Sequence, residues 1–439
     1  MTDYIALLMF PVMLISVFAG FPVAFCLMGI ALIFGIFGFG ASLPPMLIRR
    51  VYGMADNYVL AAVPLFIFMG TMLERSGIAK RLFEAITIWT GRLKGGLAIA
   101  TILMCTIIAA CTGIIGASEV MVGVMAIPAM LKRKYNHQLI CGTICAGGAL
   151  GTLIPPSVVT VVYGPSAGIS VGRLLIATII PGLLLSTLYI LYIAIRSHMN
   201  PVFAPPVPAE ETRMPLKEKL VITAKGMVPS LLLIFSVLGV IVLGLSAPTE
   251  AAALGAFGSI VLTIAYGNFS LQALKETVIQ TLKISSMIMI ILTGGAMFSG
   301  IFLGMGGGAA TEKMLAAMNI GPWGVLILFL FIIYLAGFIL DWASILLVFV
   351  PIFSPIIAKL GFDPIWFGTL FIMMIQTSYL TPPMAPAIFY LRGIAPPEIT
   401  TNEIFQGIIA YMFLQLVGIA MVTVFPGIAL WLPSKLIGF

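Results

Sequence analysis

The stretch Gly147-Gly148-Ala149-Leu150-Gly151-Thr152-Leu153-Ile154-Pro155-Pro156-Ser157 interrupts an apolar segment with glycines, hydroxyl groups and two prolines. A second run, Gln376-Thr377-Ser378-Tyr379-Leu380-Thr381-Pro382-Pro383, repeats this pattern 227 positions later. Proline removes a helix hydrogen bond and clashes with the preceding turn, so each run predicts a broken helix. Broken helices at membrane depth are tolerated only where they line a cavity. A matching pair of breaks in a hydrophobic chain therefore indicates a secondary transporter.

The composition predicts that most of the chain lies in a lipid bilayer. Of its 439 residues, 61% are hydrophobic and only 8% are charged, a balance that soluble domains do not have. The net charge of +7 does not indicate nucleic-acid binding, because the basic residues lie in short loops and form no patch. The N-terminus lacks a basic leader, so the first apolar stretch is expected to be a retained span.

The cysteines and histidines do not predict a metal centre. All five cysteines lie in apolar segments, and Cys141 and Cys145 share one helix face. A metal pair there is the less favoured interpretation, since cysteine commonly packs as a small hydrophobic residue. The two histidines, His137 and His198, both lie beside basic loops. We therefore expect no cofactor.

The apolar segments predict an all-α polytopic membrane protein with about ten full spans of roughly 20 residues each. They lie at 4–19, 21–38, 57–73, 139–165, 173–195, 228–244, 250–266, 285–303, 364–390 and 404–432. Two further apolar stretches, 96–131 and 322–358, each contain a polar, glycine-containing break. Each is either two ordinary spans or one re-entrant hairpin. Arms of about 15 residues favour a hairpin whose tip stops near the midplane.

The two halves are predicted to be inverted repeats. Residues 1–196 form the first, with hairpin 96–131 and broken helix 139–165. Residues 228–439 form the second, with hairpin 322–358 and broken helix 364–390. The proline-rich segment 197–227 is the expected cytoplasmic linker. With the N-terminus outside, most of the 22 Lys and Arg fall on the cytoplasmic side, which sets the orientation.

Two amphipathic stretches, 43–56 and 270–283, also recur at the common offset. We predict that both are helices lying along the membrane surface. The alternative is that each is a plain connecting loop.

The breaks are the candidate functional sites. A half-helix offers carbonyl oxygens at its C-terminal end, which suit sodium, and N–H groups at its N-terminal end, which suit a carboxylate or sulfonate. Hydroxyl groups at the breaks come from Thr112, Ser118, Thr152, Ser157, Ser344, Thr377, Ser378 and Thr381. The alternative is that these hydroxyls only satisfy helix carbonyls, as they often do in membranes. The glycine run 304–308 lacks the context of a phosphate-binding loop, so transport must draw on an ion gradient.

Two acidic residues lie at hairpin depth. Asp341 either joins an ion site or caps the second arm of the second hairpin. Glu119 in the first tip can bind a cation, relay a proton or select against a substrate. Its alternative role is that of a partly hydrated carboxylate at a helix start.

These motifs together resemble the large membrane subunit (permease) of a TRAP transporter, a tripartite ATP-independent periplasmic transporter. The resemblance covers essentially the whole length. It is carried, in this order, by Gly151–Ser157 with Tyr163-Gly164, Ala247-Pro248-Thr249-Glu250-Ala251-Ala252, Gly337-Phe338-Ile339-Leu340-Asp341 and Leu380-Thr381-Pro382-Pro383.

The resemblance implies a function and partners that composition does not show. Such subunits work in the bacterial inner membrane with a small four-helix membrane subunit and a periplasmic substrate-binding protein that delivers a small organic anion. Transport is sodium-driven import on an elevator fold of the ion-transporter superfamily. Sodium is the coupling ion and the only metal expected, and no enzyme activity is expected.

The resemblance also implies ligand sets. The first sodium site falls on Thr112, Gly151, Ile154 and Pro155, and the second on Gly337, Ser378 and Thr381. The positions of Gly113 and Asp341 at the two tips add these residues to the first and second site. For the substrate, the residues near the breaks predict contacts with Ser118, Glu119, Thr152, Ser157 and Ser344. The chain departs from the family pattern at two places. Ile114, Ile115 and Glu119 stand in a tip that is often serine-rich, and Ser378 stands where a glycine is usual.

Two other functions compete with this hypothesis. A stand-alone sodium- or proton-coupled organic-anion transporter has the same hairpins but needs no binding protein. A non-transporting scaffold, or a subunit of a redox complex, requires haem or quinone ligands that two histidines near one face supply poorly.

Overall fold

A computed structural model describes residues 2–113, 116–208, 214–382 and 385–436, and its regular structure is helical throughout this part of the chain. The first half contains α1 (Thr2–Leu7), α2 (Met9–Phe18), α3 (Val23–Phe39), α4 (Leu43–Ala55), α5 (Ala62–Arg75), α6 (Ile78–Thr90), α7 (Gly96–Thr112), α8 (Ala117–Lys132), α9 (His137–Ala149), α10 (Val158–Ala167) and α11 (Val171–Met199). The second half contains α13 (Leu216–Val242), α14 (Pro248–Ala265), α15 (Leu271–Gly304), α16 (Gly307–Met318), α17 (Gly321–Ala336), α18 (Trp342–Lys359), α19 (Pro364–Leu380), α20 (Pro386–Ile394), α21 (Thr401–Val424) and α22 (Gly427–Leu436). Short 3-10 turns are η1 (Gly40–Ser42), η2 (Tyr58–Ala61), η3 (Leu150–Thr152) and η4 (Pro201–Phe203).

Eight helical segments of the described chain are long and apolar enough to cross a membrane. Shorter apolar helices, among them α7, α10, α17 and α19, lie between them. The prediction of an all-α polytopic membrane protein is therefore confirmed, while the number of ten full spans stays a prediction.

Helices of the second half recur at the common offset of 227 positions. Helix α3 corresponds to α14, α9 to α19 and α10 to α20. The start signals recur as well. Asn136 Oδ1 accepts a hydrogen bond from the Leu139 N–H (3.2 Å) at the start of α9. Asp363, at the equivalent position before α19, accepts from the Ile365 (2.7 Å) and Trp366 (3.0 Å) N–H groups. Such caps satisfy amide groups that have no partner inside the helix.

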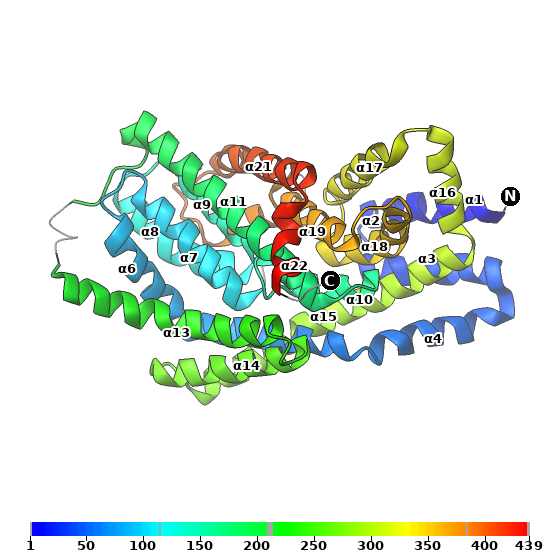
Figure 1. The fold of residues 1–439 in the computed structure, drawn as a ribbon, viewed down its shortest axis with the longest axis horizontal. Helices are drawn as coiled ribbons and strands as arrows, with labels where there is room; N and C mark the ends of the chain where they lie inside the picture. Colours follow the sequence, from blue (N-terminus) through cyan, green and yellow to red (C-terminus); the bar gives the residue numbers. More distant parts are fainter. Residues whose placement is uncertain (1, 114–115, 209–213, 383–384, 437–439) are drawn as a thin grey trace.

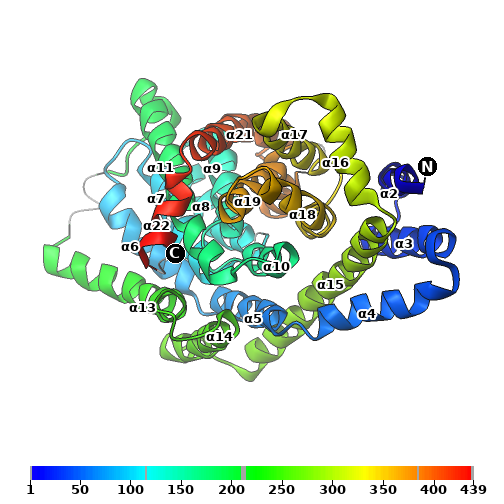
Figure 2. The ribbon, with the colours of Figure 1, turned by 45° about the vertical axis from the view of Figure 1, so that its right-hand side comes forward.

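The helices form an outer frame and an inner bundle (Figures 1 and 2). The frame consists of α3, α4, α5, α13, α14 and α15, in which α3 packs on α15 and α5 on α14. The bundle consists of α7 to α11 and α17 to α21. In the most apolar window of the segment Val23–Ala55, only 33% of residues are buried, whereas 72% are buried in that of α18. The segment Val23–Ala55 thus exposes many apolar side chains, whereas α18, which follows the second hairpin tip, is shielded within protein.

The long helix α15 differs from the prediction of a separate surface helix at 270–283. It runs without a break from Leu271 to Gly304. The first half is interrupted at the equivalent place, since α4 ends at Ala55 and α5 begins at Ala62. Residues 271–293 contain neither proline nor glycine, so nothing in the sequence stops the helix there.

The connection between the halves is shorter than the predicted linker 197–227. Helix α11 continues to Met199 and α13 begins at Leu216, so residues 200–215 connect them. Leu216 to Leu220 are good helix formers, and they start α13 directly after Pro215.

Candidate functional site

The first hairpin tip joins α7 to α8 through two side chains. Thr112 ends α7, where its hydroxyl group donates to the Ile108 carbonyl (3.0 Å) and lies 2.9 Å from Ser118 Oγ of α8. Gly113 follows with φ +61°, a left-handed conformation that favours glycine. Ile114 and Ile115, which are the predicted departure from the serine-rich pattern, lie outside the described residues.

This tip packs directly on the break between α9 and α10. A methyl group at Gly113 would overlap the carbonyl oxygen of Pro156, and the Gly113 carbonyl accepts from the Val158 N–H (3.4 Å). Pro155 and Pro156 have no N–H, so the carbonyl groups of Gly151 and Thr152 lose their usual helix donors. The Thr152 carbonyl accepts instead from the Ser157 hydroxyl (2.5 Å). The structure thus places the Gly113 tip against Pro156 and Val158, at the break that contains Gly151, Ile154 and Pro155, and the sodium site there stays a prediction.

The second hairpin tip is organised by Asp341. Its carboxylate accepts from the Ala343 N–H (3.1 Å) and from the Ser344 hydroxyl, which makes it the cap of α18. The capping role that the sequence predicted as one alternative is therefore present. The Ser344 hydroxyl is occupied by this bond.

The break after α19 lies against this tip. A methyl group at Gly337 would overlap the Ser378 side chain, so α17 and α19 touch at these two residues. Ser378 donates to the Ile375 carbonyl (2.6 Å), and Thr381 donates to the Thr377 carbonyl (2.8 Å). Their hydroxyl hydrogens satisfy helix carbonyls, and the oxygen lone pairs remain as acceptors. Pro383 lies outside the described residues.

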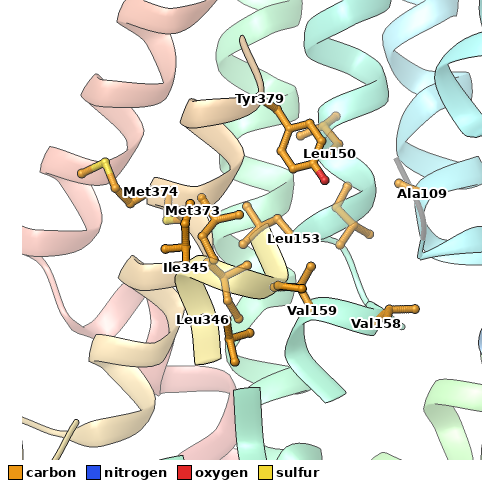
Figure 3. Packing of buried hydrophobic residues seen from close by; sticks show 14 of the residues in the cluster. Ala109, Leu150, Leu153, Val158, Val159, Ile345, Leu346, Met373, Met374 and Tyr379 are labelled. Carbon is orange, nitrogen blue, oxygen red and sulfur yellow. The ribbon is translucent and has the colours of Figure 1, made fainter. Parts of the chain in front are cut away.

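The two breaks face each other across the bundle. Figure 3 shows Leu150, Leu153 and Val159 of the first half packed beside Ile345, Leu346 and Met373 of the second. These side chains are buried and belong to one apolar cluster. The breaks are therefore parts of one packed unit.

A cavity of about 590 Å³ opens at these breaks, and we call it the break cavity. Residues at the starts of three helices line it, namely Gly116 before α8, Val158 of α10 and Trp342 of α18. Gly113, Thr152, Tyr379 and Tyr390 line it as well. Helix N-termini carry partial positive charge, which favours an anion. At α10 the Val158 N–H already donates to the Gly113 carbonyl, and at α18 Asp341 caps the Ala343 N–H.

The predicted substrate residues are placed unevenly around this cavity. Thr152 lines it. Ser118, Glu119, Ser157 and Ser344 are buried at the breaks and lie outside its lining.

Glu119 is fully buried in the first turn of α8. Its side chain packs on Gly148 of α9, and the Cys145 thiol lies beside the carboxyl group. No amide, hydroxyl or amine of the described residues donates to its oxygens. Glu119 thus lies at a helix start, as its alternative role predicted, but it is fully buried there.

The sequence did not single out several residues that line the break cavity. Glu74 of α5 and Gln280 of α15 come from the frame, and Tyr390 comes from α20. None is next to a proline break. For Gln280 the offset of 227 positions was the available signal, because its counterpart Gly53 lines a second cavity.

The family model of the tripartite ATP-independent periplasmic transporter DctM component matches residues 10–428. The chain belongs to this family. The C4-dicarboxylate TRAP transporter large permease protein DctM of Pseudomonas aeruginosa is 30% identical over 388 residues, which cover 88% of this chain and 89% of that protein. The isethionate TRAP transporter permease protein DctMQ of Oleidesulfovibrio alaskensis is 28% identical over 416 residues, covering 94% of this chain and 64% of that longer protein.

The fold of this TRAP permease also resembles that of a solved transporter. The crystal structure of YdaH from Alcanivorax borkumensis matches with a TM-score of 0.64 at 15% identity, covering 94% of this chain and 97% of that one. At this identity the likeness shows the fold alone.

Membership of the family fixes the general role of the chain. It is the large permease of a secondary transporter for organic acids and a multi-pass membrane protein, not an enzyme. TRAP transporters work with a small membrane subunit and a periplasmic binding protein.

Proposed function

We propose that this TRAP permease imports a small organic acid across the bacterial inner membrane by sodium symport, with a small four-helix membrane subunit and a periplasmic binding protein as partners. The substrate carries a carboxylate or a sulfonate group. The dicarboxylate and isethionate relatives support these two chemistries, because isethionate is a sulfonate.

One observation carries this proposal. The starts of α8, α10 and α18 line the break cavity, and no Lys or Arg of the described residues lines it. An anionic group can therefore be held by the partial positive charge at these helix starts, by the uncapped start of α8 and by hydroxyls, without a fixed counter-charge. The volume of the break cavity, about 590 Å³, suits a small organic acid, and Thr152 supplies a hydroxyl at the cavity wall.

Sodium is proposed to bind at the carbonyl ends of the same breaks. The first site uses Thr112, Gly113, Gly151, Ile154 and Pro155, where proline leaves the Gly151 carbonyl without a helix donor. The second uses Gly337, Asp341, Ser378 and Thr381. Carbonyl, hydroxyl and carboxylate oxygens are the ligands that hard cations prefer. Bound sodium would also place positive charge near the anion, which couples the two binding events.

The frame and the bundle give a physical basis for an elevator. The bundle contains both hairpins and both breaks, whose apolar side chains pack on one another, and we propose that they move together (Figure 3). The frame helices expose apolar side chains and are expected to stay fixed in the lipid with the small subunit. We propose that the halves are inverted repeats and that the bundle slides along α5 and α15.

Uptake into proteoliposomes tests this proposal. The chain is reconstituted with its small subunit, and the substrate-loaded binding protein is added outside with or without an inward sodium gradient. We expect uptake that requires both. Uptake without the binding protein would favour the stand-alone transporter, and uptake without sodium would contradict the symport.

A further inference from the structure

A second cavity, of about 550 Å³, lies between the frame and the bundle, and we call it the arginine pocket. It occupies the place in one half that the break cavity occupies in the other. Five lining positions of the two cavities are related by the same offset of 227: Gly53 and Gln280, Asn57 and Ile284, Leu60 and Met287, Val120 and Leu347, Val124 and Pro351. If the halves are inverted, as proposed above, the two cavities open toward opposite sides of the membrane.

The two cavities differ in charge. Arg49 and Arg50 of α4 line the arginine pocket, and no acidic residue of the described chain lines it. The break cavity has Glu74 and no basic residue in its described lining. Neither arginine of the pocket takes part in an ion pair between described residues. The pocket therefore presents two guanidinium groups without a counter-charge in its wall.

The position of Arg50 is fixed by a glycine. Its side chain crosses α15 at Gly300, where an added methyl group would lie 2.7 Å from Nε and 3.1 Å from Cδ. Gly300 is buried, so it leaves space for the arginine stem and for no larger residue. The stem of Arg50 up to Nε thus lies against α15, while the residue as a whole stays exposed and can be reached from the pocket.

Polar groups of both the frame and the bundle complete the pocket. The Asn57 side-chain oxygen Oδ1 accepts from the Val59 N–H (3.1 Å), which leaves the side-chain amide hydrogens available. Ser166 of α10 and Ser299 of α15 also line the pocket. Leu347 and Pro351 of α18 form its bundle wall. A ligand seated here would touch both the frame and the second hairpin.

We propose that the arginine pocket is a receiving site for the organic anion on the side from which it enters, with Arg49 and Arg50 binding its carboxylate or sulfonate. This inference rests on the proposed function. Guanidinium groups match the two oxygens of such anions and form charge-assisted hydrogen bonds. The described lining of the break cavity has no basic residue, so positively charged side chains are available to the anion in the arginine pocket and not there. An anionic lipid headgroup has the same chemistry and is the alternative source of the ligand.

Protection from an arginine-selective reagent tests the pocket directly. The chain with its small subunit is placed in phosphatidylcholine nanodiscs and treated with phenylglyoxal, and modification of each arginine is followed by peptide mass spectrometry. Succinate and isethionate serve as probes, with chloride at equal ionic strength as the control. We expect either probe to slow modification of Arg49 and Arg50 several-fold. Arg81, which stacks on Tyr266 outside the pocket, should be unaffected.

The same assay separates the alternatives. Protection that appears only when phosphatidylglycerol is added would assign the pocket to a lipid headgroup and overturn the proposal. Absence of protection under all these conditions would also overturn it. The assay needs neither sodium nor the binding protein, so its failure is distinct from a failure of the transport assay.

Two variants test the role of Arg50. Gly300→Ala displaces its side chain and should abolish the protection by succinate, whereas Gly239→Ala, which adds a methyl group where no atom lies within 4 Å, should keep it. Unchanged protection in Gly300→Ala would overturn the placement of Arg50. Should Gly300→Ala fail to fold, Arg50→Lys removes the planar fork but keeps the charge, and we expect on the order of tenfold weaker protection at Arg49. Full protection in that variant would contradict the proposal.

Discussion

The two halves of this permease have the same order of helices but different chemistry at their breaks. The first break depends mainly on backbone: Pro155 and Pro156 remove two helix donors, and Gly113 packs on the Pro156 carbonyl oxygen, while Ser157 donates to the Thr152 carbonyl. The second is built from side chains, with Asp341 capping α18 and the Ser378 side chain against Gly337. The repeat thus sets where the helices break, and the residues that differ between the halves set what each break can bind.

The largest expected effect is a loss of stability, and it separates the cost of the backbone conformation at Gly113 from the cost of its close packing. Gly113→Ala places a side chain at φ +61° and against the Pro156 carbonyl oxygen, so we expect it to lower the free energy of unfolding by about 2–4 kcal/mol. Gly168→Ala is the matched control, because it has φ +68° but no atom within 4 Å of the added methyl group. It should cost about 1–2 kcal/mol. Thermal unfolding in detergent measures both, and equal losses would show that the tip does not depend on this contact.

The next effect tests the side-chain character of the second break. Thr381→Val removes one proposed sodium ligand while keeping the shape, and we expect sodium affinity to fall on the order of tenfold. Thr369→Val is the control on the same helix, since Thr369 is also buried and donates to a carbonyl four residues earlier (3.0 Å). Sodium-dependent uptake and the amount of folded protein are measured together. An equal fall in both quantities for Thr381→Val would exclude a specific sodium role.

Local sequence rules predicted the breaks and caps but not the surfaces that meet there. Pro155, Pro156 and Asp341 act on their own helices, so their effects were predictable from sequence. The burial of Glu119 depends on Gly148 of another helix, and the position of Arg50 depends on Gly300, about 250 residues away in the chain. The continuity of α15 was missed because its amphipathic start resembles a separate surface helix. These features depend on contacts between segments that are far apart in the chain, which a local sequence pattern does not show.

A smaller effect distinguishes the two roles of Asp341. Asp341→Asn keeps an oxygen that can cap α18, whereas Asp341→Ala loses the cap and should cost about 1 kcal/mol. If Asp341 also binds sodium, both variants lose sodium-dependent uptake, although only the alanine variant loses stability. Asp363 is the control cap, because it serves α19 in the same way. Normal uptake by Asp341→Asn would contradict the ligand role and leave capping alone.

The smallest effect concerns two positions of α4 and α15 that are related by the offset of 227. Arg49 lines the arginine pocket, whereas Glu276 occupies the equivalent position in α15 and pairs with Arg75 of α5. Both side chains of that pair are substantially exposed, and water and salt weaken such contacts. We expect Glu276→Gln to leave the melting temperature and uptake unchanged within error, with Glu312→Gln, which breaks the exposed pair with Lys359, as the control. Buried packing, including Thr277 of α15 against Met72 of α5, holds these two helices together instead. A clear loss in Glu276→Gln alone would show that the ion pair fastens α5 to α15. The equivalent positions of Arg49 and Glu276 would then differ in mechanical role as well as in charge.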